Sequence, residues 1–102
     1  MIYRITASFR EETASDLRGK LNDGSIGAQQ PDGQEIVESL HRAVRTATGM
    51  IKWTERCYCN PPLAHERSTV LDHYFDQLHT EAITKHEEYE GCPFLQYLEE
   101  IS

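Results

Sequence analysis

The sequence lacks a long apolar segment. No run in its 102 residues approaches the roughly 18 to 20 apolar side chains that a membrane-spanning helix requires. The first residues, Met1 to Ile5, have a strand-like pattern and lack the basic and then apolar segments of an export signal. These two absences predict a cytoplasmic protein with no membrane partner.

Basic residues are also few. The chain has 10 lysines and arginines against 17 aspartates and glutamates, which gives a formal net charge of -7. A chain with this charge repels the phosphate backbone of DNA or RNA at long range. We therefore expect no nucleic-acid partner.

Cysteine is scarce, with three residues, at positions 57, 59 and 92. An odd number leaves at least one thiol unpaired in any intramolecular scheme, and a cytoplasmic location keeps thiols reduced. The sequence therefore predicts free thiols and not a disulfide framework.

Recognisable catalytic motifs are missing as well. The 6 glycines form no phosphate-binding pattern, and no serine lies in a nucleophile motif. The sequence thus contains no strong catalytic constellation, and whether the protein is an enzyme stays open at this stage.

The most regular stretch that is present runs from Met50 to Cys59. Its period-two alternation is typical of a strand, and a Thr-Gly turn precedes it while an Asn-Pro-Pro sequence ends it. It holds the only tryptophan and two of the three cysteines. One side of this strand carries Ile51, Trp53, Glu55, Cys57 and Cys59.

Similar patterns predict the other elements. Segment 33–45 is ambiguous, because its apolar residues recur at helical spacing while its second half also alternates as a strand. The predicted elements are a strand over 1–9, a helix over 10–22, a short helix over 32–39, a strand over 40–47, the strand over 50–59, a long helix over 60–79, a strand over 81–84 and a terminal helix from residue 93.

This order predicts a ferredoxin-like α+β sandwich. The arrangement is a βαββαβ antiparallel sheet with helices on one face, here with a short extra helix before the second strand and a C-terminal helix. At 102 residues we expect a single α+β domain over 1–102. Nothing in the chain obviously covers the second face of the sheet, so we expect a homodimer.

A two-residue turn at Thr48-Gly49 sets the register of the predicted hairpin. It places Val44 opposite Trp53 and Arg42 opposite Glu55. The Arg42–Glu55 pair brings opposite charges together on the more enclosed face.

Three groups of residues could carry chemistry. Cys57 and Cys59 share a strand face and could bind zinc or act as a redox pair, with His65 as a third metal ligand. The competing interpretation is that these cysteines are two small buried apolar side chains.

The second group is a polar stripe on the predicted long helix. Its members follow one another at steps of four, three, four and three, which could bind a divalent metal or simply face solvent. The stripe consists of His65, Thr69, Asp72, Asp76 and His79.

The third group could line a small-molecule pocket between the sheet and the helices. Its members are polar groups among apolar ones, as ligand sites require, and the competing interpretation is a structural Arg42–Glu55 salt bridge. The expected ligand-binding residues are Arg4, Arg42, Trp53 and Glu55.

Three functions follow from these groups. The first is a dimeric protein that binds a small molecule or a partner without its own catalysis. The second is a small cofactor-free enzyme with a pocket between sheet and helices, and the third is a metal or thiol protein that uses Cys57, Cys59 and His65. No cofactor can be named from the sequence.

Overall fold

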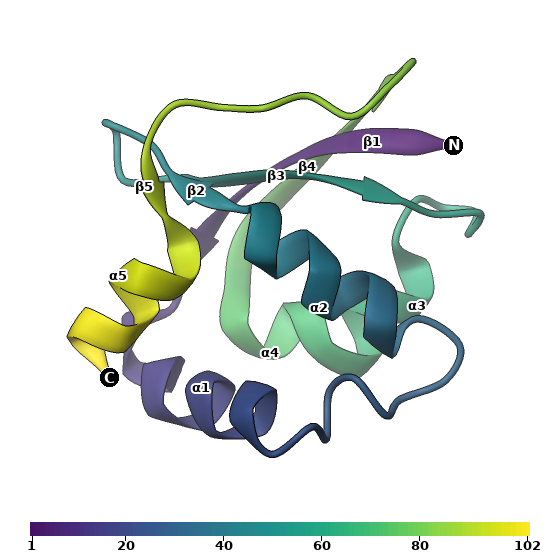
Figure 1. Cartoon of the computed structure of the whole chain (residues 1–102). Coiled ribbons are helices and arrows are strands. Elements are labelled where there is room, and N and C mark those ends of the chain that lie inside the picture. Colours follow the sequence, from purple (N-terminus) through teal and green to yellow (C-terminus); the bar gives the residue numbers. More distant parts are fainter.

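Five strands form one antiparallel sheet, and the helices lie on one side of it (Figure 1). The computed structural model describes all 102 residues. The elements are β1 (Ile2–Phe9), a 3-10 turn (Glu11–Thr13), α1 (Ala14–Asn22), α2 (Gly33–Arg42), β2 (Val44–Arg45), β3 (Ile51–Arg56), α3 (Ala64–Glu66), a π-helical turn (Arg67–Leu71), α4 (Asp72–Tyr74), β4 (Phe75–Ile83), β5 (Cys92–Pro93) and α5 (Phe94–Ile101).

The strands lie in the order β4-β1-β3-β2-β5. β1 is an interior strand, next to the edge strand β4, and pairs with β3 on one side and with β4 on the other. The two-residue strands β2 and β5 extend the sheet beyond β3. None of the helices combines the length and the apolar character that a membrane crossing requires.

Aromatic rings fill the space between the sheet and the helices. The ring of Phe75 lies 5.2 Å from that of Trp53 and 5.8 Å from that of Phe94, measured between centroids. Phe9 packs edge-on against Phe94 at 5.2 Å. Such tilted and edge-on pairs add about 0.5–1.5 kcal/mol each beyond the area that they bury. The aromatic cluster therefore fixes the positions of β3, β4 and α5 relative to one another.

Much of the predicted order of elements is confirmed. The first strand, the first helix, the strand around Trp53 and the C-terminal helix all occur close to their predicted bounds, and the protein belongs to the α+β class. The sequence patterns predicted these elements correctly because each element buries one face, so its apolar residues recur at the period of that element.

The prediction for segment 32–47 was wrong in its second half. Helix α2 continues to Arg42, and the following strand holds only Val44 and Arg45. The helix buries Ile36, Ser39 and Leu40 on one face, which is the helical spacing that the sequence also allowed. Packing of this face against β3 therefore favours the helical spacing over the strand alternation in this segment.

The predicted hairpin register was wrong by one residue. Val44 lies opposite Lys52 and not opposite Trp53. The cause is a three-residue loop, 47–49, in which Gly49 adopts a φ of 87° in the left-handed region. A loop of this length with a left-handed glycine at its end is a common alternative to the two-residue turn. The predicted cross-strand contact between Arg42 and Glu55 does not form, because Arg42 belongs to α2.

The predicted long helix was wrong at both ends. It begins at Ala64, after Leu63 has turned the chain with a φ of 61°, and it ends at Tyr74. Residues 75–83 form the edge strand β4, so the predicted strand over 81–84 is the end of a longer one. Asp76 and His79 therefore lie on a strand, and the predicted polar stripe does not exist on one helix.

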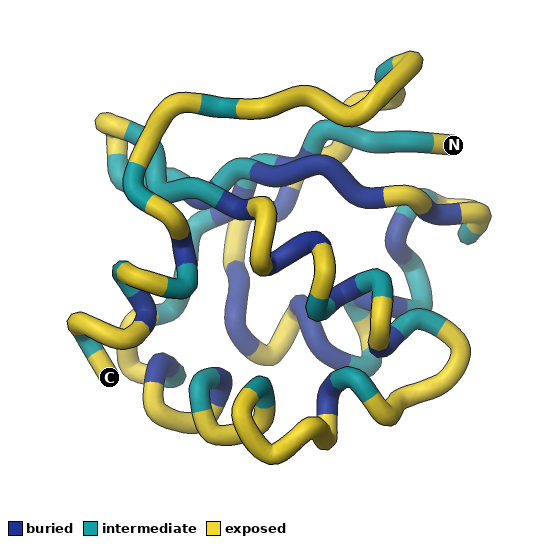
Figure 2. The backbone as a smooth tube through the Cα atoms, viewed as in Figure 1, coloured by how far each residue is buried: buried dark blue, intermediate teal, exposed yellow.

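The second face of the sheet is not bare, contrary to expectation. Residues 84–91, which we call the strap, run across it between β4 and β5 (Figure 1) and are mostly exposed themselves (Figure 2). Polar contacts hold the strap to the sheet. They join Glu87 to Arg4 at 2.8 Å, His86 to Thr54 at 2.7 Å and the ring of Tyr89 to Lys52 at 4.4 Å.

Candidate metal centre

Strand β3 directs a series of alternate side chains toward the helices. Ile51, Trp53 and Glu55 are fully buried, and Cys57, just beyond the strand, is 3% exposed. The series continues the period-two pattern seen in the sequence. It therefore carries a carboxylic acid and a thiol into the interior, next to the largest aromatic side chain of the chain.

Two thiols and one carboxylate meet at the end of this series. The Sγ atoms of Cys57 and Cys59 each lie 3.6 Å from Oε2 of Glu66 and donate their S–H groups to it. The backbone N–H of Cys59 also donates to Sγ of Cys57 at 3.2 Å. The three ligand atoms all lie within 4.8 Å of one another. A single metal ion could contact all three.

The helix after the thiols brings Glu66 to this place. Leu63, at the start of the helix, and Val70, one turn after Glu66, are both buried. Glu66 lies between them at helical spacing, so its carboxylate is on the core side and only 2% exposed. A buried carboxylate needs partners, and the two S–H groups supply them.

Burial also determines the state of the thiols. Removal from water, with a smaller contribution from the nearby Glu66 carboxylate, raises the pKa of Cys57 to about 12. Cys57 is therefore a neutral thiol at pH 7 when no metal is bound. A neutral, buried thiol is a poor nucleophile, so the geometry does not favour thiol catalysis.

Glu55 is a second buried acid beside this group. Its Oε1 accepts a hydrogen bond from Nε1 of Trp53 at 3.0 Å, while its Oε2 is buried without a partner in the protein. Burial raises the pKa of Glu55 to about 8, and the carboxylates of Glu66 and Glu35 add to the shift. Glu55 is therefore mostly protonated at neutral pH.

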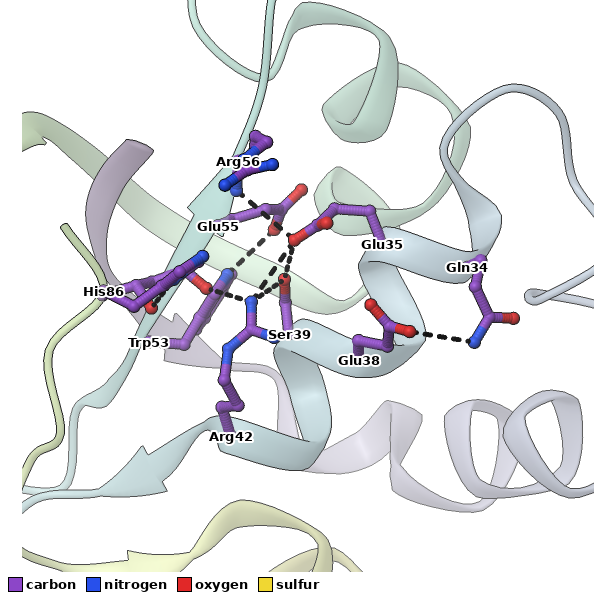
Figure 3. A network of polar contacts seen from close by, with 10 residues as sticks. Gln34, Glu35, Glu38, Ser39, Arg42, Trp53, Glu55, Arg56 and His86 are labelled. Carbon is purple, nitrogen blue, oxygen red and sulfur yellow. Dashed lines mark hydrogen bonds and ion pairs between the residues drawn. The ribbon is translucent and has the colours of Figure 1, made fainter. Parts of the chain in front are cut away.

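Arg42 joins α2 to β3 but contacts other groups than the one expected (Figure 3). Its Nη2 donates to Oε2 of Glu35 at 3.3 Å, to Oγ of Ser39 at 3.2 Å and to the carbonyl oxygen of Thr54 at 2.9 Å. Its charge still lowers the pKa of Glu55, although less than the hydrogen bond from Trp53 does. Arg42 thus stabilises the end of α2 against the strand.

A hollow of about 470 Å³, which we call the thiol pocket, gives access to the two cysteines and the carboxylate. Cys59 is only half-buried, so its thiol is reachable from this hollow. The pocket is lined by Pro31, Asp32, Glu35, Arg56, Cys57, Tyr58, Cys59 and Glu66.

His65 does not join the two thiols. Its Nδ1 contacts Oδ2 of Asp32, in the loop before α2. Neighbouring residues on a helix point in directions about 100° apart, so a helix that turns Glu66 inward turns His65 away. Of the predicted metal ligands, the structure therefore brings together Cys57 and Cys59, with Glu66 in the place expected for His65.

The predicted ligand-binding residues do not share a pocket. Trp53 and Glu55 are fully buried, and Arg42 faces a different hollow. Arg4 lies on the opposite face of the sheet, where it pairs with Glu81 at 2.8 Å and with the strap. No cavity is lined by two of these four residues.

Glu66 was missed by sequence reasoning, although a signal was present. It lies three residues after Leu63 and four before Val70, on the apolar stripe of the predicted helix. A carboxylate on such a stripe must be paired or bound when the helix packs.

Comparison of the chain with protein-family models, with curated proteins and with solved structures finds no match.

Proposed function

We propose that the chain binds a soft divalent cation, with zinc as the best fit, through Cys57, Cys59 and Glu66. The observation that carries this proposal is the approach of their three ligand atoms to within 4.8 Å of one another. Thiolate and carboxylate are both common zinc ligands, and two thiolates disfavour the hard cations calcium and magnesium. The proposal therefore keeps the two cysteines of the predicted metal set and replaces its histidine.

Three protein ligands leave one of the four tetrahedral positions of zinc free. Sites with three protein ligands and one exchangeable position differ from the closed four-ligand sites of structural zinc. The thiol pocket of about 470 Å³ lies beside the ligands, so water or a small molecule can complete the coordination. This favours a binding or transfer role for the metal over a purely structural one.

Metal binding must displace protons from this site. The raised pKa of Cys57 shows that its thiol keeps its proton at pH 7 in the metal-free protein. Zinc binds the thiolate form, so uptake of the ion releases protons and its affinity rises with pH. The buried carboxylate of Glu66, which accepts both S–H groups, can then bind the cation together with the two thiolates.

Metal reconstitution tests the proposed function. We expect the reduced protein to bind one equivalent of zinc, and cobalt(II) to give the thiolate-to-metal absorption band of a two-sulfur site. Cys59→Ser should weaken zinc binding about a hundredfold, because loss even of an outer partner costs 10–100-fold. Cys92→Ser is the control, since Cys92 lies on β5, and it should bind zinc as the wild type does. Retention of full affinity in Cys59→Ser would exclude the site.

We propose further that the chain forms a homodimer through the outer edge of β4. This nine-residue strand pairs only with β1, so its other edge presents unpaired backbone groups that a second copy can bind. The small core of a 102-residue chain also gains from a partner. Light scattering on the purified protein should give twice the chain mass of 11.7 kDa. A single chain mass at every concentration would overturn this proposal.

The fold itself supports a finer assignment. We propose that it is a ferredoxin-like sandwich with one added edge strand. In the order β4-β1-β3-β2, β3 is antiparallel to both β1 and β2, so β1 and β2 run parallel on either side of it, as in a split βαβ unit. The two-residue strand β5 is the addition.

A cytoplasmic location is also proposed. It is supported by the three free cysteines, since reduced thiols persist in the cytosol and tend to be oxidised in exported proteins. The cofactor-free enzyme receives no comparable support, because the residues expected to serve it line no common cavity.

A further inference from the structure

A second hollow adjoins the thiol pocket and has a different character. It has a volume of about 560 Å³, and four of its six lining residues are hydrophobic. Two residues, Arg56 and Tyr58, line both hollows and so form the wall between them. We call this second hollow the apolar slot, and it is lined by Met1, Ile2, Arg56, Tyr58, Ile83 and Thr84.

Exposed apolar surface is concentrated at the apolar slot. Met1 and Tyr58 are the two large hydrophobic side chains that the protein exposes, at 58% and 83%, and both line this one hollow. Exposed apolar side chains that gather in one place mark a binding surface more often than scattered ones do. The gathering therefore indicates that a ligand with apolar surface binds here.

Arg56 supplies a charge that the protein itself does not neutralise. The other six arginines each contact a carboxylate or an aromatic ring. The side chain of Arg56 makes no such contact, although the chain has 17 acidic residues. Its guanidinium is thus available to a ligand, and a guanidinium binds a carboxylate with two parallel hydrogen bonds.

We propose that the apolar slot binds a small carboxylic acid with an apolar tail. Arg56 holds the carboxylate at the wall between the two hollows, and the tail lies against Met1, Tyr58 and Ile83. The volume of about 560 Å³ lies within the range of small-molecule sites, roughly 300–1,000 Å³. This inference goes beyond metal binding and does not require a metal in the thiol pocket.

The charges around the apolar slot suit an anion in spite of the net charge of the chain. None of its six lining residues is acidic, whereas the thiol pocket is lined by Asp32, Glu35 and Glu66. The long-range repulsion from a net charge of -7 is screened beyond about 8 Å at physiological salt. Arg56 is therefore the only charged side chain that lines the slot, and an amine of the same length lacks an anionic partner there.

A titration with three six-carbon probes tests the inference. Hexanoate, 1-hexanol and hexylamine are each added to the reduced protein in the presence of a metal chelator, and binding is followed by the amide chemical shifts. We expect hexanoate to bind saturably, with the largest shifts at residues 2, 56–58 and 83–84. The alcohol and the amine should bind at least about tenfold more weakly, because they form no charge-assisted pair with Arg56.

Two variants locate the interaction. Arg56→Gln should weaken hexanoate binding at least about tenfold and leave 1-hexanol binding unchanged. Arg18→Gln is the matched control, since it removes the same charge from helix α1, where Arg18 pairs with Glu99, and it should bind hexanoate as the wild type does. Equal binding of all three probes, shifts away from the slot, or full affinity in Arg56→Gln would overturn the proposal. Because the chelator keeps metal out, these outcomes are independent of the zinc proposal.

Discussion

Glu55→Gln should make the metal-free protein more stable than the wild type at alkaline pH, by about 4 kcal/mol at pH 9. Burial raises the pKa of Glu55 from 4.5 to about 8 in the folded protein. Above pH 4.5 the unfolded chain loses this proton while the folded chain keeps it. Stability therefore falls by about 1.4 kcal/mol per pH unit until the pH passes the folded pKa. The contribution of the Glu55 proton to the free energy of unfolding is complete below pH 4.5 and is lost by about pH 8 to 9.

The glutamine side chain does not titrate, so this loss disappears in the variant. Its amide oxygen can still accept the hydrogen bond from Trp53, and its unpaired amide group resembles the unpaired Oε2 of the protonated acid. Near pH 5 the two proteins should therefore have similar free energies of unfolding, within about 1 kcal/mol. Urea unfolding at pH 5, 7 and 9 measures the difference.

Glu38→Gln is the matched control for this experiment. It removes the same charge from α2, where Glu38 is exposed and contacts only Gln34, at 3.5 Å. Its stability should follow the wild-type curve at all three pH values. If Glu55→Gln also followed that curve, Glu55 would have to be ionised in the folded protein at neutral pH.

Glu66→Gln should weaken zinc binding about a hundredfold, whereas His65→Gln should change it by less than about threefold. Glu66 belongs to the ligand group, and a neutral amide oxygen is a much weaker zinc ligand than a carboxylate. His65 contacts Asp32 and lies outside the group. Competition with a chromogenic zinc chelator gives both affinities on the same scale.

The two neighbouring positions separate the structure-based site from the sequence-based one. An amide oxygen can still accept the S–H groups of Cys57 and Cys59, so Glu66→Gln should remain folded, which circular dichroism checks. A large loss of affinity in His65→Gln with little loss in Glu66→Gln would restore the set Cys57, Cys59 and His65. It would also require the first turn of α3 to rotate on metal binding.

The error at the end of the predicted long helix has a physical cause in β4. Between the pairs Thr6–His79 and Ser8–Asp76, β1 advances by two residues and β4 by three, so β4 contains a bulge. Gln77, within it, has a φ of 53°. The bulge brings Phe75 and Leu78 to the same face although they are three residues apart. Their spacing imitates a helix, so no period in the sequence could reveal the strand.

The candidate site was predicted correctly only in the part that lies along one strand. Alternation alone placed Cys57 on the face of Trp53 and Glu55, and the structure confirms the burial of all three. The third ligand depends on which side of the next helix faces the core. That side is set by the apolar stripe of the helix, and Glu66 lies on this stripe between Leu63 and Val70. His65, one residue earlier, points about 100° away from Glu66, so the stripe favours Glu66 over His65 as the third ligand.

The interior position of β1, between β3 and β4, bears on how the chain folds. The strand at the amino terminus pairs with residues far along the sequence, as in the contact of Ile2 with Ile83. Neither neighbour of β1 is local, since its other partner is β3. Contacts of such high sequence separation slow folding, because the entropy of closing a long loop is lost before the contact forms. During synthesis, the first strand must stay unpaired on one edge until β4 has left the ribosome.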